Sequence, residues 1–496
     1  MLYRIMVPAI MVGFMLVISE SLSKTIIIPA ESRHYDFNPD CIRASRADSG
    51  LDIDTGDIGI PSGYSERNQF VHPDWIYFNN PWGPGEDELI IGINSSGNVD
   101  TVRATAGTPK WPYWMVCNAL PGGNSDYENP YIRVSRDKIN WVRPFAIGTD
   151  STPQVHIDTV WVRDPIYDST FFNNYPACSA AYFSDVELAG YDGCENLWCV
   201  FRIINLGMGD LRRGIIAIPS TNGITWRIND TTYLVTDSGP GLNEETVEML
   251  SPTINRNSEA NWEMWFVNKA TSEVGQCDST HVIKLTCPKL DTLWWSSYQN
   301  EYAGTYETCS IVPPSDSVGI WHIQVIGHPL GGMRRYMLAT VTEGNFCTAT
   351  YGQFLYYSDS LGLNWVMANE VIPCSYPDTA AWDYCTYRGS FLFEKSGSGW
   401  CLPTLYSGFN YRFNPDSVVY QIGYTVIHTN CCGDVNNDGD TDLYDITYLV
   451  AYLYLSGPPP YPLESADVNH DGTVNIFDIS YLISYLYLDG PAPDCP

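Results

Sequence analysis

The sequence predicts an all-β five-bladed β-propeller over residues 66–428, followed by a small all-α module at residues 429–496. Two observations predict this architecture. A unit of about 70 residues, made of short strands and tight turns, recurs through the large region. A twelve-residue stretch then occurs twice, 33 positions apart, and each copy precedes an apolar run. The remaining residues divide into an N-terminal leader, 1–23, and a segment at 24–65.

The N-terminus has the pattern of an export signal. Arg4 precedes the apolar run Ile5–Ile18, which has the length of a signal-peptide core and is too short to span a bilayer. Ser21 and Ser23 supply the small residues that a signal peptidase requires. We expect removal of residues 1–23 and a secreted, extracellular or cell-surface protein without a membrane span; the alternative is an uncleaved anchor.

Composition narrows the class of protein further. The chain has 26 basic and 57 acidic residues, a balance that would repel nucleic acid and excludes it as a partner. Its fifteen cysteines form no CxxC metal-binding pattern, which in an exported protein indicates disulfides. Because fifteen is odd, at least one thiol of a monomer is unpaired.

The β-region repeats a turn that ends in tryptophan. The copies end at Trp141, Trp226 and Trp365, with a weaker one at Trp294. Ser, Asp, Asn and Gly supply each turn, two β-branched or aromatic runs precede it, and we expect the tryptophan to pin the turn onto a sheet.

Each unit also begins with a characteristic strand. The first two are FVHPDWIYF and AAYFSDVELA, and the next three are EMLSPTIN, IWHIQVIG and CTYRGSFLF. Asp185, Ser251, His322 and Arg388 lie at spacings of 66, 71 and 66. Five units of three or four strands describe a propeller, and the apolar segment Thr25–Ala30 could complete its last blade.

These motifs resemble those of the five-bladed β-propeller glycosidase superfamily, of the arabinanase, β-xylosidase and fructosidase type. The resemblance rests on HPDWIYF, ENPYIRVSRDKINW, WHIQV and YRGSF and covers most of residues 66–428. It implies a glycoside hydrolase that acts on a polysaccharide or oligosaccharide. It also implies Asp74 as base, Asp185 as pKa modulator and Glu248 as general acid.

The first strand of each blade lines the channel, so the polar residues on these strands should converge there. We expect the following residues to bind substrate: His72, Glu128, Arg202, Ser251, His322 and Arg388. Glycoside hydrolysis needs one protonated and one ionised carboxyl, which such a channel could supply.

Alternatives remain open for each residue. Glu244, Glu245 and Glu128 compete with Glu248 for the role of acid. Asp185 could instead cap a turn, Asp74 could fix a bend, and His322 could be a hydrogen-bonded core histidine. A sugar-binding propeller without turnover and a structural surface module are the rival functions.

The repeated twelve-residue stretch has the pattern of a calcium loop. Calcium takes six to eight oxygens, and glycine at position 6 permits the sharp turn, here at Gly439 and Gly472. The expected ligands of two ions are Asp434, Asn436, Asp438, Asp440, Asp442 and Asp445, and Asp467, Asn469, Asp471, Thr473, Asn475 and Asp478. Two loops in register make a chance match improbable.

Each loop precedes an aromatic helix that stops at Gly-Pro, and residues 433–489 therefore resemble a type I dockerin. That resemblance implies a calcium-dependent module that binds a cohesin domain of a scaffold or surface protein. The usual Ser/Thr pair at positions 10 and 11 is replaced by Leu443-Tyr444 and Ile476-Phe477, so these residues would dock a different cohesin or pack on the module's own helices. We also expect a disulfide from Cys495 to Cys431 or Cys432.

Overall fold

The computed structural model describes residues 43–44, 47, 49–51, 53, 69–78, 89–93, 99–103, 111–119, 128–147, 181–190, 196–205, 213–221, 223, 232–236, 248–257, 261–269, 280–292, 295–296, 301–302, 305–315, 318–327, 335–343, 350–358, 361–374, 381–396, 399–410, 420–428, 432–436, 441–460, 463–469 and 471–493. Several predictions of the sequence fall outside these ranges. They concern the leader 1–23, the strand Thr25–Ala30, and the residues Glu244, Glu245, Cys431, Asp438, Asp440 and Cys495.

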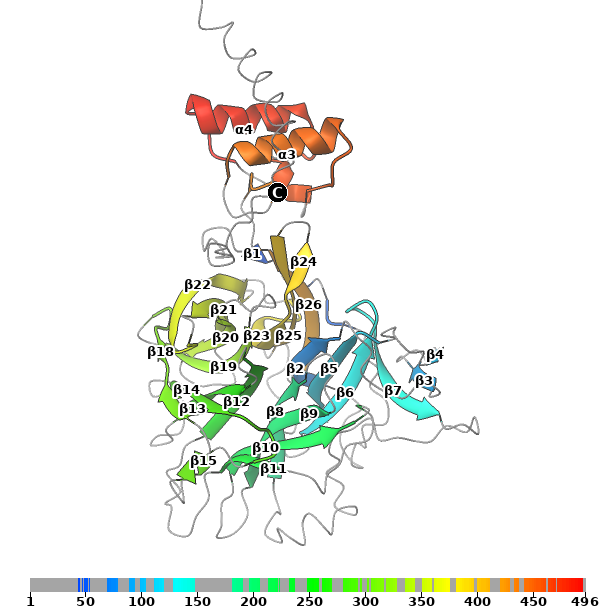
Figure 1. Ribbon diagram of the computed structural model, residues 1–496, viewed down its shortest axis with the longest axis vertical. Coiled ribbons are helices and arrows are strands. Elements are labelled where there is room, and N and C mark those ends of the chain that lie inside the picture. Colours follow the sequence, from blue (N-terminus) through cyan, green and yellow to red (C-terminus); the bar gives the residue numbers. More distant parts are fainter. Residues whose placement is uncertain are drawn as a thin grey trace, which may run out of the picture. The chain divides into compact units, whose positions relative to one another are not determined.

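Strands of residues 43–44 and 70–428 form five sheets, the five blades of a propeller (Figure 1). Blade one holds β2 (Phe70–Tyr77), β5 (Tyr113–Ala119), β6 (Asn129–Ser135), β7 (Trp141–Ile147), β3 (Leu89–Ile93) and β4 (Val99–Arg103). Blade two holds β8 (Ala181–Ala189), β9 (Leu197–Asn205), β10 (Arg213–Ser220), β11 (Thr232–Thr236), β15 (Trp295–Ser296) and β16 (Glu301–Tyr302).

The other three blades follow the same order from the centre outwards. Blade three holds β12 (Glu248–Arg256), β13 (Trp262–Lys269), β14 (Thr280–Cys287) and β17 (Thr305–Thr308). Blade four holds β19 (Val318–Gly327), β20 (Arg335–Glu343), β21 (Thr350–Ser358), β22 (Asn364–Pro373) and β18 (Ser310–Ile311). Blade five holds β23 (Cys385–Phe391), β25 (Gly399–Phe409), β26 (Tyr420–His428) and β1 (Arg43–Ala44) in that order, and β24 (Glu394–Ser396) pairs with β25 off this path.

The five-bladed architecture predicted from the repeated strands is confirmed. The predicted head strands are β2, β8, β12, β19 and β23, and each lies at the inner end of its sheet. The ring is joined in blade five, where Arg43 and Ala44 pair antiparallel with His428 and Ile427. A strand from the N-terminal segment thus extends the sheet formed by the end of the propeller sequence.

Apolar faces of neighbouring blades pack on one another. One cluster combines Leu250 of blade three with Ile323 of blade four and Phe409 of blade five, all almost fully buried. The tight turn before Trp141 behaves as the sequence predicts: Asp137 accepts hydrogen bonds from the backbone of Ile139 and Asn140, and the Trp141 indole donates to the Lys138 carbonyl at 2.9 Å. The turn tryptophan therefore fixes the hairpin to its own sheet.

A ring of polar side chains joins the inner strands to one another. Asp74 Oδ2 accepts from Leu188 N at 2.8 Å, and Glu187 Oε1 accepts from Ile254 N at 3.1 Å. The remaining links, in blade order, are Val325 N to Thr253 Oγ1 at 2.9 Å, Phe391 N to Gln324 Oε1 at 3.4 Å, and Ser390 Oγ to Asp74 Oδ1 at 2.8 Å. We call Asp74, Glu187, Thr253, Gln324 and Ser390 the inter-blade ring.

The C-terminal module contains helix α3 (Leu443–Tyr454), the short 3-10 helix η6 (Leu463–Ala466) and helix α4 (Ile476–Leu488). Ile446 and Leu449 of α3 pack with Ile479 and Leu482 of α4 in one apolar cluster. Within the described ranges, no helix is both long and apolar enough to cross a membrane.

Candidate functional site

A bulge on every inner strand directs polar side chains into the channel. The register of each inner strand shifts against its neighbour, for example between Val71 and Asp74 and between Ser184 and Glu187. His72, Asp185 and Ser251 have φ values of 55°, 57° and 49°, a region that non-glycine residues rarely adopt. Such backbone strain concentrates at functional sites.

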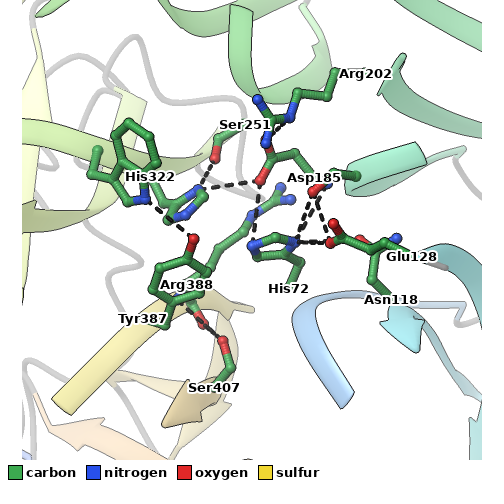
Figure 2. Close-up of polar contacts among 12 residues, drawn as sticks. His72, Asn118, Glu128, Asp185, Arg202, Ser251, His322, Tyr387, Arg388 and Ser407 are labelled. Carbon is green, nitrogen blue, oxygen red and sulfur yellow. Dashed lines mark hydrogen bonds and ion pairs between the residues drawn. The ribbon is translucent and has the colours of Figure 1, made fainter. Parts of the chain in front are cut away.

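The side chains of His72, Asp185 and His322 converge from three blades (Figure 2). Asp185 Oδ1 lies 3.5 Å from His72 Nε2 and 3.2 Å from His322 Nδ1. Arg202 Nε lies 2.6 Å from Asp185 Oδ2. All three cluster residues are buried, so water contributes little to their solvation.

Glu128 and Asn118 hold the other side of the His72 ring. His72 Nδ1 lies 3.1 Å from Glu128 Oε1 and 3.3 Å from Asn118 Oδ1. Ser184 donates to the same Glu128 oxygen at 2.8 Å. A carboxylate at Nδ1 favours a proton there and leaves Nε2 with a lone pair directed at Asp185 and the channel.

His322 is held by a different set of groups. Its Nδ1 lies 2.5 Å from Ser251 Oγ, and its ring meets that of Tyr387 edge-on at 4.4 Å. Tyr387 also stacks on His72 at 5.2 Å and accepts from the Trp321 indole at 3.3 Å. Tyr387 thereby fixes the separation of the two imidazoles.

The charges at the centre favour an ionised Asp185 beside a neutral His322. Burial opposes ionisation of Asp185, but Arg202, then His72 and His322, outweigh it and hold the pKa of that carboxyl well below its ordinary value. Burial lowers the pKa of His322 to about 3, although Asp185 opposes that shift. His322 is therefore neutral at physiological pH and available as a ligand.

These residues suit a divalent metal ion. One ligand atom from each of His72, Asp185 and His322 can be chosen so that all lie within 4.8 Å of one another. The Nε2 atoms of His72 and His322 are buried and have no hydrogen-bond partner among the described residues. Two imidazoles and a carboxylate form a donor set typical of zinc and other transition metals, with a position left for a reactant. Glu128 behind His72 repeats the carboxylate–histidine arrangement of metal sites.

The side chain of Arg388 extends from blade five toward His72 and Asp185 (Figure 2). Its side chain is fully buried, and Nη2 donates to Glu187 Oε2 at 3.2 Å. Its Nε and Nη1 have no hydrogen-bond partner among the described residues. The buried positive charge therefore faces both layers of the channel.

The predicted catalytic residues are not all brought together. Asp185 lies in the cluster, whereas both carboxylate oxygens of Asp74 accept hydrogen bonds in the inter-blade ring. Burial raises the pKa of Asp74 to about 6, against the lowering effect of Arg388. Glu248 begins strand β12, and its side chain is outside the described part of the structure.

All six residues expected to bind substrate lie in or next to the cluster. Sequence reasoning did not identify Asn118 or Ser184; it placed Glu187 among the residues that converge on the channel but gave it no chemical role. The signal for Glu187 was present, since it follows Asp185 by two residues on one strand, as Asp74 follows His72. Burial, together with the charge of Asp74, raises the pKa of Glu187 well above its ordinary value, and Arg388 opposes that shift.

The calcium loops have the oxygens that a cation needs. Asp434, Asp445, Asp467 and Asp478 are buried, although each carries a carboxylate. Burial and then the nearby charges of Asp467 and Asp471 raise the pKa of Asp478, and its Oδ1 is buried without a hydrogen-bond partner among the described residues. Such crowding of carboxylates is stable when a cation lies between them, so the residues fit calcium.

The residues at loop positions 10 and 11 are exposed. Tyr444 and Phe477 each keep 67% of their surface accessible, and Leu443 and Ile476 keep 39% and 53%. These residues are thus accessible on the surface of the module. Tyr454 with Leu455 and Tyr487 with Leu488 repeat the pattern at the far ends of the helices, with 58% and 70% exposure in both copies.

Comparison with known proteins adds two findings. The Dockerin type I domain model matches residues 432–487. Curated protein sequences gave no match. Among solved structures, an N-acetylgalactosamine deacetylase from F. plautii, in complex with blood group B trisaccharide, has a TM-score of 0.54 and 16% identity, covering 78% of this chain and 95% of that chain.

Two further solved structures are glycoside hydrolases. A family 117 enzyme from the marine bacterium Zobellia galactanivorans has 8% identity and a TM-score of 0.43, covering 79% of this chain and 92% of that chain. An α-L-arabinofuranosidase from Fusarium graminearum has 10% identity and a TM-score of 0.38, with coverage of 72% and 77%. The chain thus combines a five-bladed β-propeller with a dockerin type I domain.

Proposed function

We propose that this chain is a carbohydrate-active hydrolase whose propeller binds a divalent metal at His72, Asp185 and His322 and removes an acyl group, held by an amide or ester bond, from a sugar. One observation carries the proposal: three buried ligand atoms from three blades lie within 4.8 Å of one another. The strained φ values of His72 and Asp185 support it, because the fold maintains them against their intrinsic cost.

The carboxyls of the channel favour this chemistry over acid–base glycoside hydrolysis. A glycosidase needs a protonated carboxyl beside an ionised one. At the cluster, the pKa of Asp185 is lowered, so this carboxyl is ionised at neutral pH. The carboxyls with raised pKa values are Asp74 and Glu187, and the oxygens of both are engaged in links to other blades or to Arg388.

Each residue of the site then has a definite role. A metal bound there would supply a Lewis acid for the acyl carbonyl and an activated water. Glu128 holds the His72 ring with Nε2 facing the channel, and Ser251 fixes the His322 ring. Arg202 balances the charge of Asp185, and Arg388 adds a buried positive charge that would stabilise a developing oxyanion.

A solved structure with a TM-score of 0.54 agrees with this choice. That protein is an N-acetylgalactosamine deacetylase in complex with blood group B trisaccharide, and thus an enzyme that removes an acyl group from a sugar. That agreement adds to the geometry and does not replace it, because 16% identity carries the fold and not the reaction.

Glycoside hydrolysis is the second candidate. In it Asp74 is the base, Asp185 the pKa modulator and Glu248 the acid. The observation in its favour is the pKa of about 6 at Asp74, near the operating pH of a catalytic carboxyl. A propeller that binds sugar without turnover is the third candidate.

A single assay separates these candidates. The purified protein is incubated with acetylated and deacetylated polysaccharides, and both released acetate and released reducing sugar are measured, before and after metal removal and zinc or manganese return. Acetate release that needs the metal and is lost in Asp185→Asn supports the proposal. Release of reducing sugar that is lost in Glu248→Gln and does not depend on metal supports the glycosidase. If neither acetate nor reducing sugar is released, the result supports a propeller that binds sugar without turnover. Val366→Ala, an exposed residue of β22, is the matched control.

The C-terminal domain is the part of the chain that would attach the proposed enzyme to another protein. We propose that two calcium ions fold the module and that its exposed apolar residues bind a cohesin of a scaffold or surface protein, outside the cell. Dockerin type I domains bind calcium, and the duplicated loops supply two sets of ligands. Tethering would raise the effective concentration of the propeller near its polysaccharide.

A further inference from the structure

The inner strands continue beyond the inter-blade ring and enclose a cavity of about 270 Å³. On β2 the order along the chain is His72, then Asp74, then the cavity residues Trp75 to Tyr77. The other inner strands follow the same order, since their equivalent residues meet at the same level of the channel. The cavity therefore lies on the opposite side of the ring from His72, Asp185 and His322.

The floor of this cavity is polar. Asp74, Glu187 and Gln324 line it, and all three are buried and hydrogen-bonded to the next blade. A molecule in the cavity therefore meets polar side chains that are held in place by the inter-blade ring.

Aromatic side chains form part of the walls. Tyr77, Trp262 and Phe393 line the cavity together with aliphatic residues such as Ile254 and Val325, and Tyr77 is 49% exposed although it lies at the end of an inner strand. The Tyr77 ring lies 5.3 Å from that of Tyr113. Flat aromatic faces around a polar floor match a sugar ring, which has apolar C–H faces and hydroxyl edges.

We propose that this cavity is a second, non-catalytic site that binds one sugar unit of a polysaccharide. Only the choice of a sugar as ligand rests on the proposed function. Arg256, whose guanidinium lies 5.8 Å from the centre of the Trp262 ring, is the donor at the rim for hydroxyls of the sugar. Bound there, a polysaccharide would be retained independently of turnover at the metal cluster.

Saturation-transfer NMR on the full chain tests the site. The probes are the methyl glycosides of xylose, arabinose, galactose and glucose. We expect at least one glycoside to receive saturation from wild type and equally from Asp185→Asn, in which the metal cluster is damaged. We expect this signal to fall at least threefold in Tyr77→Ala and in Tyr77→Ala/Trp262→Ala, with hydrolytic turnover of a small substrate unchanged.

Two outcomes would overturn the inference. In the first, no glycoside receives saturation from the wild-type protein. In the second, the signal is lost in Asp185→Asn but retained in the Tyr77 variants. Tyr77→Ala removes an exposed side chain, so it keeps the test valid if the double variant does not fold. Tyr485→Ala, an exposed tyrosine of the C-terminal domain, is the matched control. Failure of the proposed hydrolysis would leave the signal from Asp185→Asn intact, so the two failures are distinguishable.

Discussion

The carboxylate of Asp74 in blade one accepts a hydrogen bond from the backbone amide of Leu188 in blade two, with 2.8 Å between Oδ2 and N. Asp74 belongs to the inter-blade ring. Leu188, the donor, directly follows Glu187, which is the ring residue of blade two. The same relationship joins Glu187 to Ile254, Thr253 to Val325 and Gln324 to Phe391. Buried amides that face the channel are thus satisfied by the neighbouring blade, which fixes the blades around the metal cluster.

Thr253→Val should destabilise the propeller by about 1–3 kcal/mol, because it leaves the buried amide of Val325 without its acceptor while keeping the shape of the side chain. Urea unfolding followed by tryptophan fluorescence measures the change. Thr253→Ser keeps the hydroxyl and loses one methyl group, so it should cost about 0.8 kcal/mol. Equal losses in the two variants would show that the ring hydrogen bond contributes nothing.

The inner strands show what the sequence could predict. Repeated β-branched and aromatic runs identified all five head strands, and period-two alternation placed His72 and Asp74 on one face. The bulge and the positive φ at His72 could not be predicted, because they depend on pairing with β5. Without them, sequence reasoning could not separate the metal-binding level of His72 from the ring level of Asp74.

The possible metal site at His72, Asp185 and His322 was missed for a related reason. His72, Asp185 and His322 are 113 and 137 residues apart, so no local spacing indicates a metal site. The calcium loops were recognised because all their ligands lie within twelve residues. A motif whose residues lie close together can be recognised in a single sequence. A site built from three blades can be recognised only when the arrangement of the blades is known.

Glu128→Gln should weaken metal binding by about 10- to 100-fold, because it removes the charge behind His72 but retains an oxygen that can accept from Ser184. Competition with a chromogenic chelator gives the dissociation constant for zinc, measured with the calcium loops kept saturated. An unchanged constant would mean that His72 does not bind the metal through Nε2. Val366→Ala should behave as wild type.

Excess EDTA should unfold residues 433–489 and leave the propeller folded. The reason is electrostatic: buried Asp467 and Asp478 repel one another once no cation lies between them. Limited proteolysis should cut the module into fragments while a propeller core survives, and calcium should restore protection. Asp434→Ala and Asp467→Ala should each reduce the calcium stoichiometry by one ion; loss of both ions in either variant would indicate that the loops do not bind independently.

The duplicated apolar faces predict an unusual pattern of binding losses. Tyr444 and Phe477 are equally exposed at equivalent positions of α3 and α4, so a cohesin can use either face. Tyr444→Ala or Phe477→Ala alone leaves one face intact and should weaken binding by about twofold, the statistical factor for losing one of two equal sites. The double variant should lose more than tenfold, since each aromatic anchor is of the kind that dominates interface energies. Isothermal titration against a panel of cohesins measures both effects, with Tyr77→Ala in the propeller as the matched control. A full loss from one single variant would mean that only that face docks, because the other copy would then contribute no alternative orientation.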